Sequence, residues 1–147
     1  MAVKINQAPS NAALALGYSG LIPFFSGAAL AAFGPSEIAL AAHQLTLLYG
    51  GLILSFLGGI NWGLFVMVDE NDRKTAWLVT GVLPSLIALV ALGFGGVVVI
   101  AILVAGFAFI LADHYRIAAK LGLPDWFIGL RRNLTIGATL SIVSLAL

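Results

Sequence analysis

Five long apolar stretches, separated by short polar segments, constrain this chain more than any other feature of its sequence. They cover about residues 12–33, 45–68, 75–92, 96–112 and 128–147. A helix that crosses the hydrocarbon core of a bilayer needs about 20 apolar residues, with a lower limit near 17. Only 9% of the residues are charged, whereas soluble domains carry about 25%. The pattern predicts a multi-pass integral membrane protein.

The apolar stretches favour helices over strands, because their hydrophobicity is continuous and does not alternate from residue to residue. We therefore expect an all-α fold, a single bundle of five transmembrane helices formed by residues 12–147 after a polar tail of residues 1–11. The last stretch reaches spanning length only if Arg131 and Arg132 extend their charged groups to the lipid headgroups. Residues 34–44 and 113–133 are expected to form loops, the second with a helix that restarts at Pro124 and Asp125, and residues 69–74 a charged turn.

The basic residues predict the orientation of this bundle. With five spans, the N-terminal tail, the second loop and the fourth loop share one side of the membrane, and they contain all seven Lys and Arg residues. The other side contains none. Because basic residues gather on the cytoplasmic side of membrane proteins, we expect the N-terminus in the cytoplasm, or in an equivalent compartment such as a matrix, and the C-terminus outside.

A stripe of small residues follows one side of the second apolar stretch. Its members are four residues apart and so lie nearly above one another on a helix: Gly51, Ser55, Gly59 and Gly63. Small residues let helix backbones approach closely, which favours association where lipid supplies no hydrophobic drive. The stripe predicts a tightly packed central helix, whose neighbour belongs either to the same chain or to another subunit.

The same stretch carries one amide, Asn61, on a different face from the stripe. Asn61, Trp62 and His43 are candidates for polar contacts, and an interhelical hydrogen bond is the ordinary role of such an amide; ligand binding is the alternative. His43 is 18 residues from Asn61, or about 27 Å along a helix, so the two side chains cannot touch.

The expected fourth loop mixes charged and aromatic side chains, as segments at the membrane interface do. Seven residues of this region are candidates for a clasp that forms ion pairs or holds an anionic lipid headgroup such as that of cardiolipin: Asp113, His114, Arg116, Lys120, Asp125, Arg131 and Arg132. The alternative is that they only signal topology and form weak surface pairs.

The sequence shows no arrangement of residues that is typical of a catalytic or metal-binding site. No serine has an adjacent base, and no phosphate-binding glycine loop or metal-ligand cluster is present. His43 and His114 are expected on opposite sides of the membrane, which argues against a haem held by both. We expect neither an enzyme nor a bound metal or cofactor, and the formal net charge of +1 gives no reason to expect nucleic acid as a partner.

Two proline-containing segments echo each other, "SGLIP" at residues 19–23 and "TGVLP" at residues 80–84. Proline removes an amide donor and frees the carbonyl four residues before it, so each segment predicts a kink. Matching broken helices can mark a transport site between repeats. Ordinary proline kinks are the alternative, since Pro is common in membrane helices.

The stretches "GYSGLIPF", "LILSFLGGINWG", "LADHYRIA" and "LPDWFIGLRRNLT" resemble a family of small bacterial membrane proteins that includes mitochondrial transmembrane-protein-69-like proteins. The resemblance covers nearly the whole chain from about residue 12. It implies a five-span protein of a bacterial inner membrane or an equivalent energy-transducing membrane. It implies no activity, substrate or catalytic residue.

Two functional hypotheses follow. The first is an accessory or structural subunit of a larger membrane complex, respiratory or photosynthetic, that binds lipids and other membrane subunits or copies of itself. It rests on the small size of the chain and its small-residue stripe. The second is a small transporter or lipid-binding protein, which rests on the paired prolines and the basic clasp.

Overall fold

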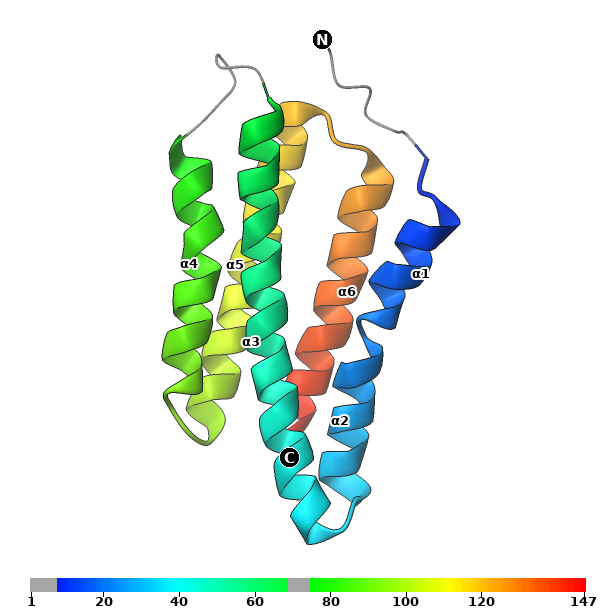
Figure 1. Ribbon diagram of the computed structural model, residues 1–147, viewed down its shortest axis with the longest axis vertical. Coiled ribbons are helices and arrows are strands. Elements are labelled where there is room, and N and C mark those ends of the chain that lie inside the picture. Colours follow the sequence, from blue (N-terminus) through cyan, green and yellow to red (C-terminus); the bar gives the residue numbers. More distant parts are fainter. Residues whose placement is uncertain (1–7, 69–74) are drawn as a thin grey trace.

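The computed structural model describes residues 8–68 and 75–147 (Figure 1). Within them every regular element is a helix, which confirms the predicted all-α class. The polar tail through residue 7 and the charged segment 69–74 lie outside the described residues. The helices, in chain order, are α1 (Asn11–Ser19), α2 (Ile22–Phe33), α3 (Ser36–Met67), α4 (Thr75–Leu92), α5 (Val97–Leu121) and α6 (Asp125–Ser144).

The helices form one elongated bundle around α3, the longest of them, which packs against α2, α4, α5 and α6. Helix α1 packs chiefly against α6 and buries none of its residues. The α5–α6 connection and the start of α1 lie at one end of the bundle in Figure 1. We call this the basic end, because the neighbouring parts of α5 and α6 carry Arg116, Lys120, Arg131 and Arg132.

Four helical segments are long and apolar enough to cross a membrane: α1 with α2 as one segment (Asn11–Phe33), then α3, α4 and α5. Helix α6 is not among them, since its first half contains Arg131, Arg132 and Asn133. The structure therefore shows a multi-pass helical membrane protein, and a fifth crossing by α6 stays a prediction.

The first apolar stretch forms two helices that meet at the expected kink, where the sequence predicted one kinked helix. Pro23 lies in the first turn of α2, where its missing N–H costs nothing. The backbone N–H of Gly20 bonds to the carbonyl of Gly17 and closes α1. The hydroxyl of Tyr49 on α3 donates to the Gly20 carbonyl at 3.0 Å and satisfies this group at the break. Pro84, by contrast, lies buried inside an unbroken α4.

Two expected loops are largely helical, so their assignment from hydropathy was wrong. Helix α3 begins at Ser36, directly after Pro35, and α5 continues to Leu121. Backbone hydrogen bonding does not stop where side chains become polar, and the actual breaks come from residues that cannot continue a helix. Gly122 adopts the left-handed conformation (φ +62°) that favours glycine and ends α5.

The small-residue stripe does not act as one contact face within the chain. A Cβ at Gly51 would lie 3.0 Å from Leu92 Cδ1, so this part packs against α4. Around Gly59 and Gly63, no described atom beyond the chain neighbours and the local helix backbone would lie within 4 Å of a Cβ. The close backbone approach between α3 and α4 is at Gly58, the residue before Gly59. A Cβ at Gly81 of α4 would lie 3.0 Å from the Gly58 carbonyl oxygen.

Adjacent glycines on α3 therefore predict opposite responses to substitution. Gly58→Leu forces α3 and α4 apart and should lower the free energy of unfolding by about 1–3 kcal/mol or more, the usual cost of overpacking. Gly59→Leu meets open space and should change it by less than about 1 kcal/mol. Unfolding by sodium dodecyl sulfate in mixed micelles, followed by circular dichroism, measures both. Equal losses would contradict the packing described here.

Candidate functional site at the basic end

Asn61 ties three helices together inside the bundle. Its side chain is fully buried on α3, and Nδ2 donates to Asp113 Oδ2 of α5 at 2.7 Å. The same amide donates to Thr80 Oγ1 of α4 at 3.0 Å, and the Thr80 hydroxyl in turn donates to the Trp77 carbonyl at 3.3 Å. Hydrogen bonds of this kind hold membrane helices in register, because unpaired polar groups are costly in an apolar surrounding.

Asp113 and His114 lie inside α5, not in the loop that the sequence predicted, and both are buried. Asp113 follows Val97, the first residue of α5, by 16 positions, which corresponds to about 24 Å along the axis. In a hydrocarbon core about 30 Å thick this places the carboxylate near the basic end and away from the bilayer centre. The Asp113 carboxylate accepts its bond from an amide and not from a basic residue of the clasp.

A second group of side chains faces α6. The His114 imidazole donates to the backbone carbonyl of Leu57 on α3, and the His114 ring lies 6.3 Å from the Phe127 ring, centroid to centroid. The guanidinium carbon of Arg131 lies 5.2 Å from the centre of the Phe127 ring, within the range of a cation–π contact. We call Thr80, Asn61, Asp113, His114 and Arg131 the polar layer.

The polar layer contains three buried atoms that have no hydrogen-bond partner among the described residues: Asn61 Oδ1, His114 Nε2 and Arg131 Nε. Buried polar groups in proteins are nearly always paired, so each such atom marks a place where a missing group belongs. Within residues 8–68 and 75–147 the layer therefore leaves three polar atoms unsatisfied.

The structure divides the seven residues of the predicted clasp. Asp113, His114 and Arg131 belong to the polar layer, while the other four point outward: Arg116, Lys120, Asp125 and Arg132. Lys120 Nζ lies 5.1 Å from the centre of the Trp77 ring. The clasp is thus not a single surface cluster, and three of its seven residues face the bundle interior.

The remaining candidates from the sequence lie apart from this layer. Trp62 is half exposed and covers Gly81, where an added Cβ would lie 2.6 Å from Trp62 Cδ1. His43 is half buried in α3, close to the opposite end of the bundle. Neither contacts Asn61 through any hydrogen bond that the described residues form.

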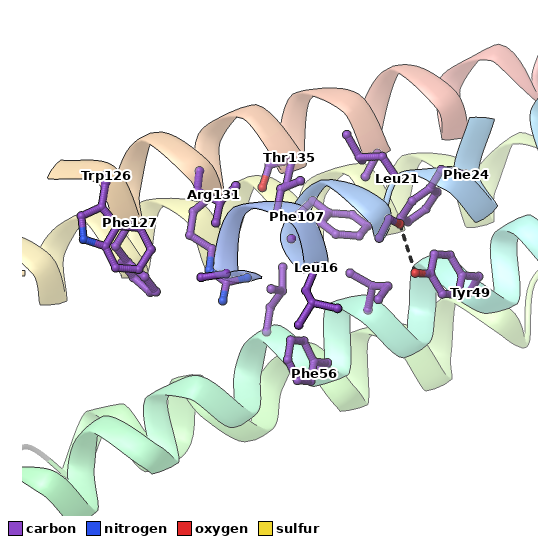
Figure 2. A pocket seen from close by; sticks show the side chains of 18 residues that line it. Leu16, Leu21, Phe24, Tyr49, Phe56, Phe107, Trp126, Phe127, Arg131 and Thr135 are labelled. Carbon is purple, nitrogen blue, oxygen red and sulfur yellow. Dashed lines mark hydrogen bonds between the residues drawn. The ribbon is translucent and has the colours of Figure 1, made fainter. Parts of the chain in front are cut away.

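An apolar pocket adjoins the polar layer. It has a volume of about 480 Å³ and lies between α1, the start of α2, α3, α5 and α6. Figure 2 shows Trp126, Phe127 and Arg131 at one end of it and Phe24 with Tyr49 at the other. Arg131 is its one charged lining residue. Sequence reasoning missed this pocket, because it exists only where α1, α3 and α6 diverge.

A family model described as "Protein of unknown function (DUF3429)" matches residues 9–147, which include the whole polar layer and the pocket. The chain belongs to this family. The DUF3429 description assigns no activity to the residues of either feature.

Two curated relatives share most of this DUF3429 chain. It is 37% identical over 137 residues to transmembrane protein 69 of Xenopus tropicalis, covering 89% of the chain and 52% of that relative. It is 32% identical over 133 residues to transmembrane protein 69 of Mus musculus, covering 89% of the chain and 54% of that relative. The chain thus spans about half the length of these relatives. No solved structure matches it.

The bond between Asn61 and Asp113 predicts a measurable coupling. Asn61→Leu leaves a buried carboxylate without its donor and should cost about 1–3 kcal/mol of unfolding free energy. The double variant with Asp113→Leu removes both partners, so its loss should be smaller than the sum of the two single losses. Unfolding of the two single variants and the double variant by sodium dodecyl sulfate gives this cycle. Simple additivity would show that the bond contributes nothing.

Proposed function

We propose that this protein is a non-enzymatic component of a larger membrane assembly, which it joins through the open part of the small-residue stripe on α3. The observation that supports this proposal is the open space around Gly59 and Gly63, one helical turn apart. A helix of another subunit can approach this face as closely as α4 approaches Gly58.

The surroundings of the two glycines support a protein partner that lies within the membrane. Phe56, Trp62 and Val66 flank them and are 64%, 46% and 68% exposed. Large side chains beside a small-residue groove supply the ridges that a partner helix packs between. The face carries no charged residue, so contacts in lipid and not surface electrostatics would hold the partner.

The proposal includes a fifth crossing by α6. Its 20 residues correspond to about 30 Å, which matches the hydrocarbon thickness. Helix α6 packs along α5 and α2 and ends at the end opposite the basic end. Basic groups at one end support an N-terminus in the cytoplasm or matrix, a C-terminus outside, and a place in a bacterial inner membrane or an equivalent energy-transducing membrane.

A small transporter or lipid-binding protein is the second candidate function. The pocket and the break between α1 and α2 favour it, because a broken helix beside a cavity leaves room for a bound molecule. This function needs no partner subunit, so the two candidates make different predictions about the size of the native particle.

Extraction of native membranes with mild detergent, followed by native gel electrophoresis and mass spectrometry, tests the assembly. The wild-type chain should migrate with other membrane proteins in a fixed ratio, and Gly59→Leu with Gly63→Leu should release it as a smaller, folded particle. Gly129→Leu changes an open glycine of α6 and serves as the control that should stay in the complex. Migration of the wild type alone would contradict the proposal.

A further inference from the structure

The pocket has a polar end and an apolar end. Near the basic end it is bordered by Trp126 and by Arg131, which lies about 9 Å along α6 from Asp125. From there, the aliphatic and aromatic side chains of Leu16, Phe56 and Phe107 continue along the bundle axis (Figure 2). A molecule that fills this space needs a polar head at the basic end and an apolar body beyond it.

Arg131 determines the charge of that head. Its Nε atom is buried and has no hydrogen-bond partner among the described residues, and the residues that line the pocket include no Asp or Glu. Its described contact is the Phe127 ring, and a cation–π contact supplies no acceptor for the Nε–H group. Arg131 is partly buried, and a cation withdrawn from water is costly unless an anion or several acceptors pair with it.

Turning outward is the usual alternative for an arginine in a membrane helix, and the neighbouring residue shows it. Arg132 is exposed, whereas Arg131 points from α6 toward α1 and α3 (Figure 2). His114 is near Arg131, but an imidazole supplies no negative charge. The carboxylate of Asp113 is bonded to Asn61. Among the described residues, the polar layer therefore provides no free anion for Arg131.

The wall formed by α1 offers a route from the lipid into this space. Helix α1 contributes Ala13, Leu16 and Gly17 to the pocket, although it buries none of its residues and packs chiefly against α6. Its short length of 9 residues and the break at Gly20 leave few contacts to hold it against α3. A lipid of the leaflet at the basic end already has its head at this level and its chains directed toward the bilayer centre.

We infer that the pocket binds an anionic amphiphile, with its phosphate or carboxylate head on the Arg131 guanidinium and an apolar chain extending past Phe56 and Phe107 toward Phe24. The inference does not depend on the assembly proposed above. Free anions share the head chemistry but leave the apolar end unfilled, so the apolar chain is part of the assignment.

Tryptophan quenching by brominated lipids tests the site directly. Trp62→Phe with Trp77→Phe leaves Trp126, on the pocket wall, as the single tryptophan. In phosphatidylcholine vesicles, brominated phosphatidylglycerol or brominated stearate should quench Trp126 at about 10-fold lower mole fraction than brominated phosphatidylcholine, as expected for a charge-assisted hydrogen bond. Stronger quenching by the phosphatidylglycerol would assign a phosphate head, and stronger quenching by the stearate a carboxylate head. Native mass spectrometry of the unsubstituted chain should show one retained anionic lipid.

Arg131→Gln should abolish this preference, while Arg132→Gln, which removes an equal charge from the adjacent exposed position, should retain it. Circular dichroism and gel filtration of both variants establish that they are folded. Equal quenching by anionic and zwitterionic lipids in the parent protein would overturn the inference. An equal loss of preference in both variants would also overturn it, since this outcome indicates general attraction to the basic end. Inorganic phosphate at millimolar concentration should not displace the lipid, and displacement would reject the role of the apolar chain.

Discussion

Helices in lipid are not pressed together by the hydrophobic effect, so the bundle depends on places where backbones and side chains approach closely. Glycines provide such places at several of the helix contacts of this protein. A Cβ at Gly106 of α5 would lie 2.6 Å from Leu54 of α3, and one at Gly137 of α6 would lie 2.9 Å from Leu21. A Cβ at Gly17 of α1 would lie 3.1 Å from Leu130 Cδ2 of α6. The glycines of this chain thus fix its interhelical distances.

The polar layer adds direction to this packing. Van der Waals contact between smooth apolar helices tolerates sliding, but the bonds from Asn61 to Asp113 and Thr80 set the relative height of α3, α4 and α5. Because water does not compete in the interior, such bonds are well defined in geometry even where their net contribution is small. The rigid side of the bundle, around α3, α4 and α5, is therefore distinct from the looser side, where α1 borders the pocket.

The class of the protein and the approximate positions of α3, α4 and α5 could be predicted from hydropathy, because lipid imposes both length and apolar composition. Hydropathy misplaced the start of α3 and the end of α5, since Pro35 and Gly122 fix them and polar residues do not. Because the sequence assigned residue 113 to a loop, it did not predict that the Asp113 carboxylate is buried. Leu103 and Ile110 lie two helical turns apart on the buried face of α5. Once α5 is extended past residue 112, Asp113 follows Ile110 by three residues and falls on the same face. The stripe was visible in the sequence, but its division into packed and open glycines depends on where α4 lies.

Helix α1 differs from the other helices in what holds it. It buries no residue, the carbonyl of Gly20 at its end is held by the Tyr49 hydroxyl, and a pocket separates it from α3. A segment with so few buried contacts opens at a free energy well below that of global unfolding. A molecule that fills the pocket beside α1 supplies the apolar contacts that α1 otherwise lacks. The order of this N-terminal segment is then a property of the protein together with its surrounding lipid, and changes with the composition of the membrane.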